Sequence, residues 1–211
     1  MIDGFEVNFN PPPMVRIVDV DLRDDLDLSI LIAHIPGPRT ESLDTLLETL
    51  IPQIAGLPVE IFIYAEPKYS VGMKRQILMN NATGRYIVYI DDDDMVPEYY
   101  VEEIMQAIKQ DVDYIGFQMQ MSVDGVDTKP TFHDWGRYKY WYDDENGYYR
   151  GVSDKNPVRR SIAVNHPFVD VSLGEDKHWA DRVAQDIKTS TYIDKIMYYY
   201  IWSRSGTLTQ R

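Results

Sequence analysis

The stretch Arg85-Tyr-Ile-Val-Tyr-Ile-Asp-Asp-Asp-Asp94 decides the fold class of this chain. Its first six residues are mainly β-branched and aromatic, which predicts a buried strand over 85–90. Four consecutive aspartates follow, although Asp is a poor strand former and adjacent like charges repel one another. Ligands of open α/β sheets bind beyond the carboxyl ends of the strands, so this cluster marks a candidate site.

The segments around this stretch alternate between strand and helix patterns. Apolar runs predict three further buried strands, at 28–33, 59–64 and 114–121. Apolar residues recur at helical spacing over 41–54, 72–82 and 97–109. We expect Pro52 to end or kink the first of these helices. This order predicts an α/β fold with an open, mostly parallel sheet flanked by helices.

The pattern changes after residue 121. Asp124-Gly125 and Asn146-Gly147 are hairpin-turn dipeptides, and the second lies between Tyr-rich flanks, which predicts an inserted small β-hairpin lobe. A helix over 174–187 and a final strand within 191–202 follow. We expect one integrated domain with three parts, an N-terminal arm at 1–27, an α/β half at 28–121 and a second half at 122–211.

Composition excludes several classes of protein. The formal net charge is −13, which disfavours nonspecific binding to nucleic acid or anionic lipid. The chain has no Cys, which rules out disulfides, thiolate catalysis and Cys-ligated metals. The N-terminus does not resemble a secretory signal, and no apolar run approaches the roughly 20 residues of a membrane-spanning helix. We therefore expect a soluble, cytoplasmic protein without integral membrane association.

Two interpretations of the aspartate cluster are open on the residues alone. A hard divalent cation such as Mg²⁺ or Mn²⁺ is held by one or two carboxylates together with phosphate oxygens of a substrate, which fits this cluster. Alternatively, the cluster is a solvated acidic turn that caps the helix beginning near Pro97. Asp94 fits that second role well.

The run from Ser70 to Asp94, SVGMKRQILMNNATGRYIVYIDDDD, resembles the family 2 type of GT-A glycosyltransferases. Those enzymes carry a Gly, an Arg-Asn pair, an Ala-x-Gly-x-Tyr-Ile stretch and an Asp-x-Asp motif in this order. Residues 31–39 resemble the first strand and Pro-containing loop of the family. Gly174-Glu175-Asp176, followed by Trp179 and Arg182, resembles its Glu-Asp motif. The resemblance implies the GT-A fold, a Rossmann-like nucleotide-diphospho-sugar transferase architecture.

The resemblance also implies an activity, the metal-dependent, inverting transfer of a hexosyl or pentosyl group from a nucleoside-diphosphate sugar to an acceptor hydroxyl. A UDP-sugar is the expected donor. By similarity, Asp91 and Asp93 hold Mn²⁺ or Mg²⁺, which stabilises the departing diphosphate as a Lewis acid. The half at 28–121 then binds the donor, and the half at 122–211 is the acceptor side. The implied nucleotide-sugar contacts are His34, Pro36, Arg39, Glu66, Lys74, Arg75 and Asp92, the last through the ribose.

The catalytic pair implied by the resemblance is Glu175 and Asp176, with Asp176 as the general base that deprotonates the acceptor. On the residues alone, two acids in the first turn of a helix are also explained by the helix dipole. Asp170 is a nearby carboxylate that competes for the same assignment.

The chain departs from the family pattern at several positions. Gln76 replaces the usual Asn, and Glu66 stands where the family usually has Asp. Many relatives place a His in the C-terminal segment, where this chain offers Ser203 and Arg204. The third metal ligand is therefore open, and Arg204 is either a diphosphate contact or an exposed surface residue. His34 likewise is either a nucleotide contact or structural.

Other functions stay open at this point. One is a catalytically degenerate GT-A scaffold that binds glycans or proteins, since fold does not dictate function. Another is a nucleotidyltransferase, although 34–38 is not a Gly-rich phosphate loop. The acceptor is a glycan, a protein, a small molecule or a modified nucleic-acid base. The aromatic segment 135–149 either stacks acceptor sugars or packs its own rings together. The sequence does not indicate the oligomeric state.

Overall fold

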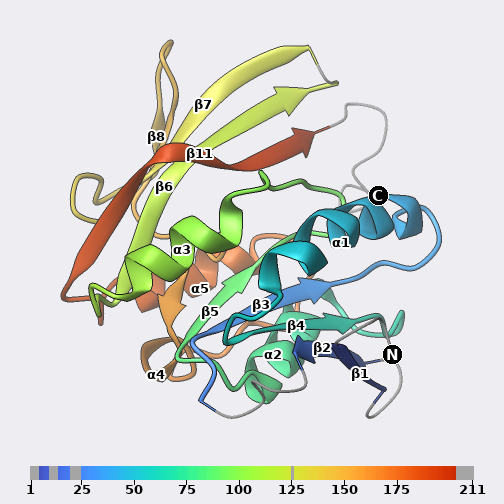
Figure 1. Cartoon of the computed structure of the whole chain (residues 1–211). Coiled ribbons are helices and arrows are strands. Elements are labelled where there is room, and N and C mark those ends of the chain that lie inside the picture. The colour runs from blue at the N-terminus through green and yellow to red at the C-terminus, as the bar shows by residue number, and fades with distance from the viewer. Residues whose placement is uncertain (1–4, 10–13, 20–24, 125, 203–211) are drawn as a thin grey trace.

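The computed structural model describes residues 5–9, 14–19, 25–124 and 126–202. A large sheet runs through the molecule, with helices on both of its faces (Figure 1). The strands are β1 (Phe5–Phe9), β2 (Met14–Asp19), β3 (Leu28–Ala33), β4 (Val59–Tyr64), β5 (Tyr86–Tyr89), β6 (Tyr114–Val123), β7 (Asp127–His133), β8 (Tyr142–Asp143), β9 (Tyr148–Arg150), β10 (Val158–Arg159) and β11 (Ser190–Trp202). The helices are α1 (Thr40–Ile54), α2 (Val71–Asn81), α3 (Tyr100–Ile108), α4 (Arg160–Ala163) and α5 (Glu175–Val183).

Three parallel strands form the centre of the sheet. β3 lies between β4 and β5 and pairs in parallel with both, and all three consist almost entirely of buried residues. Their apolar runs explain this burial, because strands covered on both faces need no polar side. β3 and β4 have the bounds expected from the sequence. The carboxyl ends of β3 and β5 deliver their loops to one edge, where the aspartates follow β5.

The sheet as a whole is mixed, which corrects the expected mostly parallel arrangement. The strand order is β1-β2-β4-β3-β5-β10-β6-β7-β9-β8, with β11 beside β6. β2 and β10 run antiparallel to both of their neighbours, whereas β7 runs antiparallel to β6 and parallel to β9. The antiparallel pairs β1–β2, β6–β7 and β8–β9 join strands that follow one another in the chain, whereas β10 lies antiparallel between β5 and β6 in the middle of the sheet. The α/β class itself is confirmed.

The segment expected as an N-terminal arm contributes two strands. β1 and β2 pair with each other, and β2 extends the sheet beyond β4. Glu60 on β4 anchors this edge, because its fully buried carboxylate pairs with Arg16 at 2.7 Å and accepts a hydrogen bond from the Ser29 hydroxyl at 2.6 Å. A buried carboxylate is tolerated here since it is fully hydrogen-bonded.

Helices cover the two faces with separate apolar clusters. On one face α1 and α3 pack through residues that include Leu46, Leu50 and Ile104. On the other face α2 and α5 pack through residues that include Leu78 and Trp179. α1 continues through Pro52 to Ile54, so this proline does not end the helix. It lies in the last turn, two residues before the helix ends.

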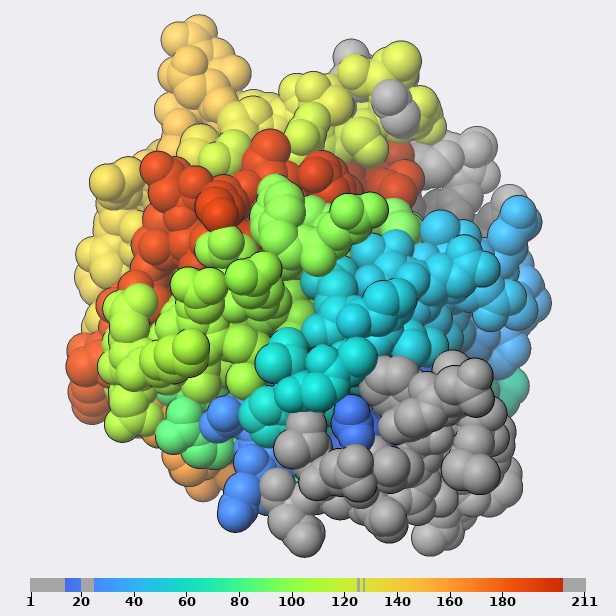
Figure 2. Space-filling view, viewed as in Figure 1, coloured from blue at the N-terminus to red at the C-terminus, as the bar shows by residue number. Residues whose placement is uncertain are grey.

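The expected β-hairpin lobe is present. β6 and β7 form a long hairpin, and β8 and β9 form a short one around Asn146-Gly147. Tyr149 stacks between Tyr142 and Phe132, with ring centroids 4.7 and 5.4 Å away. Figure 2 shows that the tip of the short hairpin projects from the body of the molecule. In this part of the segment the rings pack on one another, which is one of the two open interpretations.

Candidate active site

The first cavity of interest lies at the carboxyl ends of β3 and β5. This strand-end cavity has a volume of about 160 Å³ and is lined by residues that include Arg39, Arg75, Asp91, Asp93, Asp176 and Tyr200. Its walls come from the loops after β3 and β5, from α2, from the start of α5 and from β11. Ligand pockets usually measure roughly 300–1,000 Å³, so this volume fits part of a nucleotide sugar, such as its diphosphate.

The four aspartates after β5 separate into two facing the cavity and two buried away from it. The side chains of Asp91 and Asp93 are 27% and 30% exposed and line the cavity. Asp92 and Asp94 are buried. The alternation places two carboxylates with one residue between them on the same side of the turn, as an Asp-x-Asp motif requires.

Asp92 supports the loop that follows β3. Its carboxylate accepts hydrogen bonds from His34 Nδ1 and the Ile35 amide, both at 2.7 Å, and from Arg39 at 2.8 Å. The side chain has no exposed surface and does not line the cavity. The expected ribose contact of Asp92 is therefore not supported by its position, and we assign it the role of holding Arg39 in place.

Asp94 ties the turn to β11 instead of capping the following helix. Its carboxyl oxygens lie 2.7 Å from the Tyr198 hydroxyl and 2.9 Å from the Ile201 amide. The Tyr198 hydroxyl also accepts a hydrogen bond from the Asp91 amide at 3.0 Å. Burial, together with the charges of Asp91 and Asp93, raises the pKa of Asp94 well above its ordinary value.

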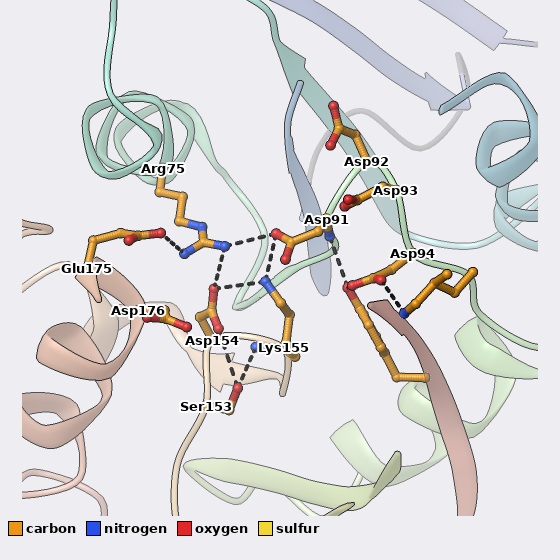
Figure 3. Close-up of polar contacts among 12 residues, drawn as sticks. Arg75, Asp91, Asp92, Asp93, Asp94, Ser153, Asp154, Lys155, Glu175 and Asp176 are labelled. Atoms are coloured by element: carbon orange, nitrogen blue, oxygen red, sulfur yellow. Dashed lines mark hydrogen bonds and ion pairs between the residues drawn. The ribbon is translucent and has the colours of Figure 1, made fainter. Parts of the chain in front are cut away.

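A buried cation on α2 organises the carboxylates on the other side (Figure 3). The Arg75 guanidinium lies 2.8 Å from Asp91, 3.3 Å from Asp154 and 2.5 Å from Glu175. Burial acts to lower the pKa of Arg75, but Asp154, Asp91 and Glu175 raise it well above its ordinary value. Arg75 therefore stays charged and ties three separate segments together.

Lys155 is a second cation at Asp91. Its ammonium lies 2.7 Å from the same Asp91 oxygen that Arg75 contacts and 3.3 Å from Asp154 (Figure 3). Burial and Arg75 lower the pKa of Lys155, while Asp154 and Asp91 raise it by more. Burial would raise the pKa of Asp91, but Lys155 and Arg75 hold it well below its usual range. Asp91 is consequently an anion that makes a poor general base.

Asp93 is less well neutralised. It pairs with Arg39 at 2.9 Å. Burial, opposed by Arg39 and reinforced by Asp91 and Asp92, raises the pKa of Asp93 to about 6. A carboxylate held in a cavity with too little positive charge nearby is one that an added cation stabilises.

The side chains available to coordinate a metal would hold a divalent cation only if a substrate supplied further ligands. Within the described ranges, no group of three or more His, Cys, Asp or Glu side chains is arranged to hold a metal. Asp91 and Asp93 offer two carboxylates at the cavity wall, and Mg²⁺-type sites commonly use one or two carboxylates plus substrate phosphate oxygens. A metal site at these two carboxylates would therefore need further ligands from a bound substrate.

A second cavity adjoins the first beneath the hairpin lobe. This lobe cavity measures about 350 Å³ and is lined by residues that include His133, Trp141, Tyr148, Arg150 and Lys155. Asp91, Asp176 and Tyr200 line both cavities, so the two meet at these three side chains. Asp176, at the start of α5, and Asp154 both line the lobe cavity, and Figure 3 draws them together with Arg75 and Asp91.

Asp176 differs from the other carboxylates around the junction. Asp91, Asp154 and Glu175 each form an ion pair with Arg75, and burial raises the pKa of Glu175 despite that pairing. Among the described residues Asp176 has no ion pair, and it accepts a hydrogen bond from the Lys177 amide. Asp170, the competing candidate, accepts a hydrogen bond from Ser70 at the start of α2 and lines neither cavity.

The remaining expected contacts fall into three groups. Arg39 and Arg75 line the strand-end cavity. His34 and Lys74 are buried beside it, with the Lys74 ammonium donating to the His34 carbonyl at 2.8 Å. Burial lowers the pKa of Lys74. Pro36 and Glu66 do not line the cavity. Ser203 and Arg204 lie outside the described residues.

Sequence reasoning missed three residues of the site. Lys155 and Asp154 come from the loop before β10, and Tyr200 comes from β11. Burial raises the pKa of Tyr200 to about 12, with contributions from Asp94 and Asp91. The adjacent opposite charges of Asp154-Lys155 are the one signal in the sequence, but only the fold brings them to Asp91.

Comparison with known proteins decides the family. The family model described as Glycosyl transferase family 2 matches residues 42–163, more than half of the chain. The chain belongs to glycosyl transferase family 2. The resemblance stated from the sequence is thus confirmed, and the enzyme class that it implied, glycosyltransferase, is the class of this family. No curated protein matches the chain.

Solved structures support the fold of this family 2 chain. S. aureus TarS residues 1–349 in complex with UDP-GlcNAc matches with a TM-score of 0.64 and 14% identity, over 87% of this chain and 60% of that one. The same TarS fragment without the sugar nucleotide in its description matches with a TM-score of 0.61 and 13% identity, over 83% of this chain and 60% of that one. The chain thus spans about 60% of the fragment's length. The expected GT-A fold is confirmed.

None of the helices in the described part of the chain is long and apolar enough to cross a membrane.

Proposed function

We propose that this family 2 chain transfers a sugar from a nucleoside-diphosphate sugar to an acceptor hydroxyl, with Asp176 as the general base. The main support for this proposal is that Asp176 lines both the strand-end cavity and the lobe cavity. A base for glycosyl transfer must reach the acceptor oxygen while that oxygen faces the donor's anomeric carbon. Asp176 lies at the junction where those two requirements meet.

The strand-end cavity is proposed as the site of the donor diphosphate. Arg39 and Arg75 supply positive charge at its wall, and their planar groups suit phosphate oxygens. UDP is the proposed nucleotide, because the structurally similar TarS fragment is described in complexes with UDP and with UDP-GlcNAc.

Asp91 and Asp93 are the proposed ligands of Mn²⁺ or Mg²⁺. A bound divalent cation supplies Lewis-acid stabilisation of the negative charge on the departing diphosphate. Lys155 and Arg75 keep Asp91 ionised, as a metal ligand must be. Asp92 positions Arg39, and Asp94 with Tyr198 fixes the backbone of Asp91.

The chemical step proceeds by displacement. The Asp176 carboxylate accepts the proton of the acceptor hydroxyl, and the acceptor oxygen forms a bond to the anomeric carbon. The bond between that carbon and the diphosphate oxygen breaks, and its electron pair leaves with the nucleoside diphosphate. Because attack and departure take place on opposite faces of the carbon, the anomeric configuration inverts. Glu175 orients Arg75 and takes no proton in this scheme.

The proposal is tested with Asp176→Asn and a UDP-sugar panel. We expect the variant to bind UDP with the affinity of the unchanged protein and to lose about 10²–10⁴-fold in release of UDP from the preferred UDP-sugar, the usual contribution of a general base. Asp170→Asn is the matched control, since Asp170 lies outside both cavities, and it should retain activity. A fully active Asp176→Asn variant would remove Asp176 from the mechanism.

A further inference from the structure

A third cavity adjoins the lobe cavity, and the two share one lining side chain, that of Trp141. This aromatic groove measures about 570 Å³, and its lining includes Trp135, Lys139, Tyr140, Trp141, Lys177 and Gln185. Trp141 also lines the lobe cavity. The three cavities therefore form a chain, joined first at Asp176 and then at Trp141. The proposed chemistry uses only the first junction.

From this continuity we infer that the acceptor is a glycan of more than one sugar, whose reacting end lies at Asp176 and whose distal sugars pass Trp141 into the aromatic groove. The inference deepens the proposed function and rests on it. It selects the glycan from the acceptor classes that the sequence left open.

The ring faces in the groove suit sugars. Sugar rings present apolar C–H faces, which pack on Trp and Tyr side chains. Both indoles are anchored, because Trp135 Nε1 donates to the Ala184 carbonyl at 3.2 Å and Trp141 Nε1 donates to the Val152 carbonyl at 3.3 Å. A platform that is already ordered loses little entropy when a ligand binds. Tyr140, at 82% exposure, adds an uncovered ring beside them.

The polar groups in the groove suit hydroxyls. The Lys139 ammonium lies 4.2 Å from the Trp135 ring centroid, and the Lys177 ammonium lies 5.3 Å from that of Trp141. Lys177 also pairs with Asp181 at 2.5 Å, and Gln185 lines the same groove. Each indole thus has an ammonium group over its ring, so a sugar that packs on the aromatic surface of the groove also meets hydrogen-bond donors. A purely apolar partner would remove these polar groups from water without offering them hydrogen bonds in return.

The test measures how glycan affinity depends on length. The unchanged protein is screened on an array of neutral and acidic oligosaccharides, and the best series is then titrated calorimetrically from the monosaccharide to the tetrasaccharide. We expect the affinity to rise by about tenfold or more along this series. Tyr140→Ala and Trp135→Ala should each remove most of that rise and leave UDP binding in the presence of Mn²⁺ unchanged.

Matched controls separate the groove from surface aromatics in general. Tyr99 lies outside all three cavities and carries Lys195 at 5.6 Å from its ring, as Trp135 carries Lys139. Tyr99→Ala should keep the full length dependence. Tyr140 is so exposed that its replacement leaves the fold intact, which covers the case in which Trp135→Ala fails to fold.

The outcomes separate this inference from the proposed function. UDP binding without any glycan binding, or with an affinity independent of glycan length, would overturn the glycan groove and leave the donor site standing. A length dependence that persists in both groove variants would also overturn it. Glycan binding that follows the groove variants, in a protein that binds no nucleotide, would support the groove and overturn the transferase.

Discussion

Arg75 Nη2 lies 2.8 Å from Oδ1 of Asp91, so a cation buried on α2 is bonded to the first carboxylate after β5. The same guanidinium reaches Glu175 at the start of α5. The donor-side strand and the helix that carries Asp176 are thus connected through one side chain. This contact couples the stability of the fold to the geometry of the site.

Loss of Arg75 should strongly destabilise the protein. Arg75→Leu leaves the carboxylates of Asp91, Asp154 and Glu175 without this partner, and breaking a buried ion pair costs about 3–5 kcal/mol. Urea unfolding followed by circular dichroism measures this loss. Lys195→Ala, which removes an exposed ion pair to Glu103 at 2.5 Å, should cost about 0–1 kcal/mol. Equal costs for the two variants would contradict the role given to Arg75.

The Tyr198 hydroxyl should matter for both stability and donor binding. Tyr198→Phe leaves the buried Asp94 carboxyl and the Asp91 amide each short of a partner. An unsatisfied buried polar group costs about 1–3 kcal/mol. Thermal unfolding should show this loss, and UDP affinity should fall because Asp91 is less firmly placed. Tyr99→Phe removes an exposed hydroxyl that bonds the Ile196 carbonyl and should change neither quantity appreciably.

Asp93 should be needed for the metal-dependent part of nucleotide binding. Asp93→Ala removes one of the two cavity-facing carboxylates, so UDP affinity should no longer increase when Mn²⁺ is added. Calorimetric titration with and without Mn²⁺ measures the difference. Asp176→Asn, which leaves both proposed ligands in place, should retain the increase. An unchanged Mn²⁺ effect in Asp93→Ala would remove Asp93 from the proposed metal site.

Stability should fall in acid because of His133. Burial lowers the pKa of His133 to about 4, although the hydrogen bond between its Nδ1 and Asn156 opposes this shift. Between the ordinary His pKa of about 6.5 and this folded value, the unfolded chain binds a proton that the folded chain does not. The free energy of unfolding therefore falls as pH drops through that window, by at most about 3 kcal/mol from this group.

His133→Gln isolates that contribution. The variant should show a flatter decline of unfolding free energy between about pH 6.5 and pH 4, measured by urea titrations across the range. An identical acid slope in both proteins would show that other groups cause the decline.

The central strands were predictable from the sequence because their burial leaves a local pattern. Leu28–Ala33 and Val59–Tyr64 are short apolar runs bounded by loop residues, and each occupies the middle of the sheet as expected. The strand Met14–Asp19 shows this apolar pattern less clearly, because it lies nearer the edge of the sheet and includes the charged side chain of Arg16. Its place beside Val59–Tyr64 is a non-local pairing that sequence periodicity does not specify.

Within the aspartate run, sequence identified the cluster but not the direction of each side chain. Asp92 and Asp93 have the same chemistry, and only the turn geometry buries the first against Arg39 and exposes the second to the cavity. Lys155 was not identified from the sequence as a residue of the site. Its contact with Asp91 depends on β10 inserting between β5 and β6, an arrangement set by tertiary packing.

Calorimetric titration of UDP and of GDP, each with and without Mn²⁺, tests the central claim most directly, because it requires no knowledge of the sugar or the acceptor. We predict micromolar binding of UDP that strengthens in Mn²⁺ and much weaker binding of GDP. Absence of binding by either nucleotide under both conditions would contradict a nucleotide-sugar donor site at Asp91 and Asp93.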